Sequence, residues 1–137
     1  MNEDQLNVAN DLRAAAASKP DKVALYSSDR SVSYAELDRL ADSLSLGLHK
    51  IGIRKNDRVC LALSNLPEFA ALFYGALRVG AVAAPINPAK PAHDLRPFIV
   101  KVHPRAIVTE ESFAGEVMSA GPHPSPVFVI GKHPTAR

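Results

Sequence analysis

The clearest periodic pattern in the chain is an apolar stripe with helical spacing between Ser33 and Gly52. Ser33 and Glu36 have the spacing of a capping box, in which each side chain satisfies a backbone N–H of the first helical turn. Gly52 stands where a left-handed residue commonly ends a helix. The pattern predicts a helix from Ser33 to just before Gly52, and its apolar positions are Leu37, Leu40, Ala41, Leu44, Leu48 and Ile51.

The rest of the sequence alternates between helical patterns and short apolar runs of strand length. In chain order, the expected elements are a helix over about Glu3–Ser18 capped by Asn2, a hairpin of Val23–Tyr26 and Arg30–Val32, a strand over Arg58–Leu63, a helix opened by Asn65–Glu68 and closed by Gly80, a strand over Ala81–Pro85, a helix near His93–Val102, a strand over Ala106–Thr109, a helix over about Glu111–Ala120 and a strand over Val127–Ile130. Strands that alternate with helices pair in parallel through crossovers. We therefore expect an α/β fold, with part of a doubly wound, mostly parallel sheet, flanking helices and a short N-terminal hairpin.

Proline and glycine modify this picture at three places. Pro97 would cost roughly 3 kcal/mol in a helix interior, so its helix is expected to begin near Asp94. The segment Gly121–Pro126 contains three prolines and is expected to be a loop. Residues 131–137 are expected to form a frayed tail.

Composition and charge place the chain in a broad class. The 137 residues are 47% hydrophobic, which predicts one globular domain spanning 1–137. The 16 basic and 14 acidic residues are interspersed, so nothing indicates a nucleic-acid surface. Cys60, the single cysteine, excludes an internal disulfide and favours a buried thiol in a reducing, cytoplasmic setting. The acidic start Met1–Asp4 and the absence of any long apolar run predict a soluble protein without a membrane span.

The sequence contains none of the common phosphate-binding loops. No Gly-x-x-x-x-Gly-Lys, no Gly-x-Gly-x-x-Gly and no Ser/Thr/Gly run beside a lysine occurs. Gly80 is isolated among alanines and is expected to end a helix. No nucleophile elbow of the Gly-x-Ser-x-Gly type is present.

Titratable residues give equally little support for a catalytic or metal site. Asp38 with Asp42, and Glu110 with Glu111, are carboxylate pairs that we expect to be solvated, on an outer helix face and at a helix start. The five histidines have no partner at metal-ligand spacing; they are His49, His93, His103, His123 and His133. Five arginines are too scattered to define an anion pocket, although folding could bring two together; they are Arg39, Arg58, Arg78, Arg96 and Arg105. We therefore expect no catalytic, cofactor-binding or metal residue in this chain.

Three ordered segments, within roughly Val23 to Ile130, resemble the opening section of the AMP-forming acyl-CoA synthetases and related adenylating enzymes. They are Val32-Ser-Tyr-Ala-Glu-Leu37, Arg58–Phe69 with its Asn-x-Pro-Glu turn, and Leu77-Arg-Val-Gly-Ala-Val-Ala-Ala-Pro-Ile-Asn87. Asn87 resembles acyl-CoA or fatty-acid ligases more than peptide synthetases. Asn56 occupies a turn where the family usually has glycine, and asparagine tolerates the left-handed conformation. Arg78-Val79 replaces the commoner Lys-Ala.

The resemblance implies the N-terminal part of a ligase's large N-terminal domain. For a full-length relative, it implies ATP, magnesium and coenzyme A: an acid becomes an acyl-adenylate, which coenzyme A then attacks. The family's phosphate loop and catalytic lysine have no matching positions here, so the chain is expected to be an inactive scaffold. Its expected partner is a second copy of the chain or the remainder of the ligase. The alternative is a standalone binding or regulatory module of ligase ancestry. A small nucleotide or flavin binder of flavodoxin type would also fit the alternating elements, but this chain lacks the phosphate-binding loop that such a protein needs.

Overall fold

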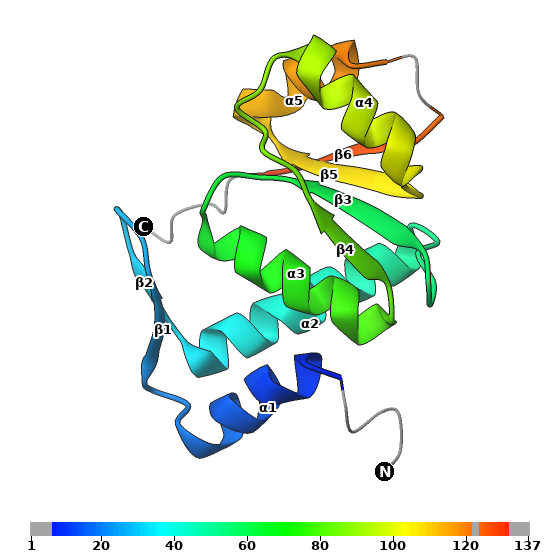
Figure 1. The fold of residues 1–137 in the computed structure, drawn as a ribbon. Helices are drawn as coiled ribbons and strands as arrows, with labels where there is room; N and C mark the ends of the chain where they lie inside the picture. Colours follow the sequence, from blue (N-terminus) through cyan, green and yellow to red (C-terminus); the bar gives the residue numbers. More distant parts are fainter. Residues whose placement is uncertain (1–6, 122–123, 132–137) are drawn as a thin grey trace. The chain divides into compact units, whose positions relative to one another are not determined.

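The computed structural model describes residues 7–121 and 124–131, which form two compact units. The helical unit contains the described residues up to Asp57 together with Asn65–Ala83. The sheet unit contains Arg58–Ser64 and the described residues from Ala84 onward. Figure 1 traces the chain through both units.

The helical unit contains three helices and a hairpin. They are α1 (Ala9–Ser18), β1 (Val23–Tyr26), β2 (Ser31–Ser33), α2 (Tyr34–Lys50) and α3 (Pro67–Val79). The strands β1 and β2 pair antiparallel, as the sequence predicts. Helix α2 packs along α3, and α1 packs against both. The unit thus consists of three packed helices, with the hairpin lying between α1 and α2 in the chain.

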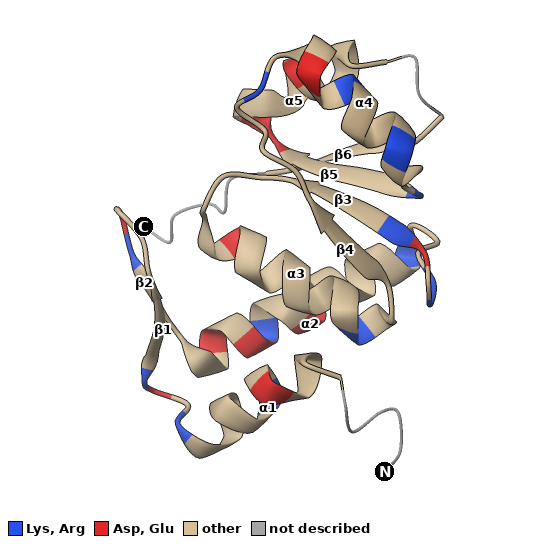
Figure 2. Cartoon of the chain, in the orientation of Figure 1, with Lys and Arg blue, Asp and Glu red and all other residues tan. Residues whose placement is uncertain are grey.

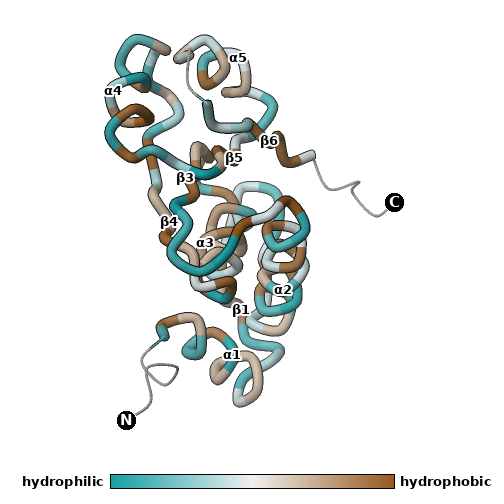
Figure 3. The backbone as a smooth tube through the Cα atoms, turned by 90° about the vertical axis from the view of Figure 1, so that its right-hand side faces the viewer, coloured by the Kyte–Doolittle hydropathy of each residue, from teal (hydrophilic) through white to brown (hydrophobic). Residues whose placement is uncertain are grey.

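Helix α2 confirms its predicted signals. The Ser33 hydroxyl accepts a hydrogen bond from the Glu36 N–H at 3.2 Å, and the Glu36 carboxylate accepts one from the Ser33 N–H at 2.9 Å. Gly52 has φ 99°, in the left-handed region that ends helices. Hydrophobic and hydrophilic positions alternate along α2 (Figure 3). Local sequence therefore determines both ends of this helix.

Helix α1 begins later than predicted. It starts at Ala9, so the expectation of a helix from Glu3 is wrong at Asn7 and Val8; Asn2 and Glu3 lie outside the described residues. The Asn7 side chain accepts a hydrogen bond from the Ala9 N–H at 2.9 Å and donates one to the Leu77 carbonyl at 3.1 Å. Asn7 therefore marks the start of the helix and ties it to α3.

Helix α3 shows the predicted N-terminal proline and C-terminal glycine. Pro67 is its first residue, where a missing N–H costs nothing, and Gly80 follows its end at φ 83°. Asn56 is also left-handed, at φ 70°, as expected at this turn. The helical core consists of Leu12, Val32, Leu37, Ala41 and Ala71, with partly buried neighbours.

The sheet unit is built on parallel strands. It contains β3 (Arg58–Ala62), β5 (Ala106–Glu110), β6 (Val127–Ile130), α4 (Ala92–Val102) and α5 (Glu111–Ser119). The sheet has the order β4-β3-β5-β6, and β4 (Val82–Pro85) straddles the boundary between the units. The pairs β3/β5 and β5/β6 are parallel, with Cys60 opposite Ile107 and Ile107 opposite Val127. The α/β fold, its parallel sheet and its small hairpin are as predicted.

The core of the sheet unit is apolar. Its buried residues are Cys60, Ala62, Leu95, Ile99, Ile107, Val117 and Ala120. Burial raises the pKa of the Cys60 thiol to about 11, so it stays protonated and packs as a small hydrophobic group. Figure 2 shows the strands of this sheet almost free of charged residues, which lie mainly on helices and connections.

Helix α4 corrects the expectation about Pro97. The helix starts at Ala92, so Pro97 lies inside it and the predicted start near Asp94 is wrong. Leu95 and Ile99, 0% and 1% exposed, bury one face of α4. We attribute the tolerance of Pro97 to this burial, which offsets one missing backbone hydrogen bond. The helix ends at Val102 and is followed by His103, a non-glycine residue with φ 50°.

The two segments predicted to be irregular are only partly described. Gly121 and Pro124–Pro126 lie outside helices and strands, and the Ser125 hydroxyl donates to the Pro104 carbonyl at 2.7 Å. Pro122, His123 and residues 132–137 lie outside the described residues. None of the helices in residues 7–121 and 124–131 is long and apolar enough to cross a membrane.

Candidate functional site

The candidate site of the sheet unit lies where the strand order reverses. The chain leaves β3 for β4 on one side and leaves β5 for β6 on the other, so the switch falls between β3 and β5. Open α/β sheets bind ligands outside the carboxyl ends of their strands at such a point. The residues that follow β3 and end β5 therefore lie where a ligand of such a sheet would bind.

Three polar side chains meet at this switch point. The Glu110 carboxylate accepts a hydrogen bond from the Ser64 N–H at 3.0 Å and bonds from the Ser64 hydroxyl at 2.8 and 3.0 Å. It also accepts one from the Ser112 hydroxyl at 2.8 Å. Beside it, the buried Thr109 hydroxyl donates to the Ala62 carbonyl at 2.9 Å. We call Ser64, Glu110 and Ser112 the switch-point cluster.

Charged side chains gather at one place in the helical unit. Arg78 of α3, with a side chain 9% exposed, forms ion pairs with Asp38 and with Asp42, the latter at 2.9 Å. The same Arg78 donates to the Asp38 carbonyl at 2.9 Å. Arg13 of α1 reaches Asp42 at 2.6 Å. This ionic tie joins all three helices.

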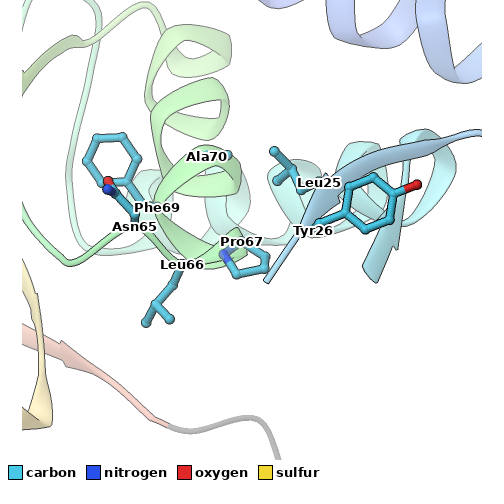
Figure 4. A pocket seen from close by; sticks show the side chains of 7 residues that line it. All are labelled: Leu25, Tyr26, Asn65, Leu66, Pro67, Phe69 and Ala70. Carbon is cyan, nitrogen blue, oxygen red and sulfur yellow. The ribbon is translucent and has the colours of Figure 1, made fainter. Parts of the chain in front are cut away.

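A shallow apolar pocket of about 270 Å³ lies elsewhere in the helical unit. Its lining residues come from β1 and from the start of α3 (Figure 4): Leu25, Tyr26, Asn65, Leu66, Pro67, Phe69 and Ala70. The Asn65 amide and the Tyr26 hydroxyl are the only polar side-chain groups among these residues, and Tyr26 is 83% exposed. Such a lining offers contact area but no acid, base or nucleophile.

Three of the four carboxylates predicted to be solvated have side-chain partners in the structure. Asp38 faces Arg78 in the ionic tie and Glu110 is partly buried in the switch-point cluster, so the solvated interpretation is wrong for these two. Asp42 also pairs with arginines, but its side chain is 48% exposed. Glu111 is exposed at the start of α5, as predicted. Arg78 lies 36 to 40 residues from Asp42 and Asp38, and Ser64 lies 46 residues from Glu110, so only folding brings these partners together.

The other residues considered from sequence lie apart. His49, His93 and His103 are exposed, and His93 contacts Asp94 at 3.4 Å, while His123 and His133 lie outside the described residues. Four of the arginines are exposed: Arg39, Arg58, Arg96 and Arg105. Sequence reasoning missed Ser64, Ser112 and Arg13 as partners, and no local signal marks them.

Within residues 7–121 and 124–131, the side chains present do not fit ATP or its metal ion. Each described helix carries an acidic residue in its first turn, where a phosphate would otherwise bind: Asp11, Glu36, Glu68, Asp94 and Glu111. A side chain at Gly80 would meet Lys55 at 3.2 Å, so this turn is packed and does not form an open cradle. Within the described residues, no three metal-ligating side chains converge.

Comparison with known proteins agrees with the fold. The chain matches the sequence profile described as AMP-binding enzyme over residues 12–136. It is 48% identical over 61 residues to long-chain-fatty-acid–CoA ligase FadD13 of Mycobacterium tuberculosis, covering 44% of this chain and 12% of that protein. It is 31% identical over 104 residues to 2,3-dihydroxybenzoate-AMP ligase of Bacillus subtilis, covering 76% and 19%.

A solved structure gives the same result. The N-terminal domain of FACL13 from Mycobacterium tuberculosis superposes with a TM-score of 0.83 at 30% identity, covering 90% of this chain and 33% of that one. The chain thus spans a fifth or less of these two curated relatives and a third of this domain. The profile match covers most of the sequence, and the chain belongs to the AMP-binding enzyme family.

Proposed function

We propose that this chain is the scaffold portion of an ATP-dependent fatty-acid–CoA ligase and is inactive alone. In this proposal it supplies the first strands and covering helices of the ligase's large N-terminal domain. The whole ligase would use ATP and magnesium to form an acyl-adenylate and coenzyme A as the acceptor. We place the protein in the cytoplasm, where its single thiol would stay reduced.

The observation that carries this proposal is the unequal coverage of the structural match. The FACL13 domain matches 90% of this chain, but only 33% of that domain has a counterpart here. The acidic first turns of the described helices support the same proposal, because they disfavour bound phosphate. The groups that hold ATP would belong to the unmatched two-thirds.

A fatty acid is the substrate class that we favour. The support is the 48% identity to FadD13 and the Asn87 that ends the third family segment. A solved Mycobacterium tuberculosis fatty acyl CoA synthetase also matches, with a TM-score of 0.84 and 27% identity. Relatives with other names match too, among them Triostin synthetase I of Streptomyces triostinicus at 47% over 62 residues.

The test is a turnover assay on the purified chain. It is incubated with ATP, magnesium, coenzyme A and fatty acids of several lengths, and pyrophosphate release is measured. FadD13 assayed in parallel serves as the positive control. We expect release at the rate of a protein-free blank, and clear turnover by the pure chain would contradict the proposal.

A second candidate function is a binding module that pairs with itself or with another chain. The observation that favours it is that β6 lies at one edge of the sheet formed by the described strands, with Val129 48% exposed. An uncharged edge strand offers unpaired backbone groups to a partner. Sedimentation over a range of concentrations distinguishes the two candidates: self-association lost in Val129→Lys supports the module, whereas a monomer throughout excludes self-pairing.

A further inference from the structure

Glu110 occupies a position that neither the family match nor the proposed function assigns. Its carboxylate accepts hydrogen bonds from two connections that leave the sheet at the switch point. Ser64 belongs to the connection after β3, and Ser112 to the first turn of α5, after β5. One side chain therefore joins both connections.

The bond to the Ser64 backbone N–H is the informative one. The Ser64 hydroxyl could rotate to another acceptor, but an N–H at 3.0 Å from the carboxylate fixes the main chain itself. A charged acceptor makes this bond stronger than one to a neutral group. The position of Glu110 just before α5 also suits a negative charge, because the helix N-terminus is positive.

We propose that Glu110 is the positioning residue of the switch point, where it holds the Ser64 backbone in one conformation. The β3 connection is thereby preformed on the side of the sheet where α/β proteins of this topology bind ligands. This role concerns the conformation of the chain and holds whether or not the chain takes part in catalysis.

The test follows amide hydrogen exchange at Ser64 in the isotope-labelled full chain by nuclear magnetic resonance. In Glu110→Ala, the Ser64 amide should exchange roughly tenfold faster or more, because a hydrogen bond to a charged group is lost. Glu110→Gln keeps the length and one acceptor oxygen, so its exchange rate should lie between those of the wild type and Glu110→Ala.

Three further variants separate positioning from general loosening. Ser64→Ala and Ser112→Ala remove hydroxyls but keep the Ser64 N–H bond, so the amide should stay protected within about twofold of wild type. Glu111→Ala, at the exposed neighbouring carboxylate, should do the same. Amides of Ile107 and Val108 in β5 report the intact sheet in every variant.

The outcomes decide the proposal in either direction. Faster exchange at Ser64 in Glu110→Ala, with unchanged β5 amides, supports it. Unchanged exchange at Ser64 in that variant overturns it, and so does loss of protection in Ser64→Ala equal to that in Glu110→Ala. If the Glu110 variants do not fold, amide exchange of Ser64 in the wild-type chain decides. An unprotected Ser64 amide contradicts the proposal, and a protected one supports it.

Discussion

The helical unit and the sheet unit are stabilised in different ways. In the sheet unit, backbone pairing sets the register of β3, β5 and β6, and the buried core consists of apolar side chains. The helical unit also has an apolar core, but no such ladder joins α1, α2 and α3. An ionic tie of Arg13, Arg78, Asp38 and Asp42 links these helices in addition. The comparison indicates that packed helices here obtain their specific arrangement from side chains, whereas the sheet obtains it from its main chain.

The largest expected effect comes from a cavity in the sheet unit. Ile107 is 0% exposed in the apolar core, so Ile107→Ala should lower the free energy of unfolding by about 2–5 kcal/mol. Urea denaturation measures the loss. Val129→Ala on the same sheet, 48% exposed, is the matched control and should change stability by about 0.5 kcal/mol or less. Equal losses in both variants would mean that this core does not stabilise the unit.

The second prediction concerns the close approach of α2 and α3. A methyl group at Gly75 would meet the Ala41 carbonyl oxygen at 3.0 Å and the Ser45 nitrogen at 3.1 Å, both of them backbone atoms. Gly75→Ala should therefore cost about 1–3 kcal/mol in urea denaturation. Gly47 lies in α2 with open space around it, so Gly47→Ala should stabilise by about 0.5–1 kcal/mol. A stabilising Gly75→Ala would refute the close packing.

The third prediction breaks the ionic tie. Arg78→Met leaves Asp38 and Asp42 without their shared partner, and Asp42 is half exposed, so we expect a loss of about 1–2 kcal/mol. High salt should narrow the gap between Arg78→Met and the wild type, because salt screens the exposed part of the tie. Arg39→Met on the exposed face of α2 is the control. A loss that salt leaves unchanged would point to packing by the Arg78 stem as the cause.

The last effect appears only at alkaline pH and concerns Cys60, whose pKa is raised by burial from the ordinary 9.0 to about 11. Below about pH 9 the thiol is protonated in both the folded and the unfolded chain. Between about pH 9 and 11 the thiol of the unfolded chain loses its proton while that of the folded chain keeps it. The free energy of unfolding therefore falls as the pH rises through this range. Urea denaturation across this range should show a shallower fall in Cys60→Ala. Parallel curves for the two proteins would contradict burial of the thiol.

The sequence predicted those helix ends that are determined by residues close together in the chain. The capping box of Ser33 and Glu36, the proline that starts α3 and the left-handed Gly80 all act within a few residues. Pro97 shows the limit of such local rules, since burial of Leu95 and Ile99 overrides its cost.

The candidate site could not be predicted from the sequence, for a physical reason. Ser64 and Glu110 are 46 residues apart, and neither carries a motif. Arg78 and Asp38 meet only after α2 and α3 have packed, and the small size of Gly75 matters only at that same contact. Parallel pairing and helix packing create these neighbours, so an isolated sequence pattern cannot reveal them.

The most direct test of the scaffold role is nucleotide binding by the pure chain. Calorimetric titration of the purified protein with magnesium and ATP should give no binding heat up to millimolar nucleotide, because the described helix N-termini already carry acidic side chains. Tight, stoichiometric binding of ATP would contradict the proposal that this chain is framework without a nucleotide site.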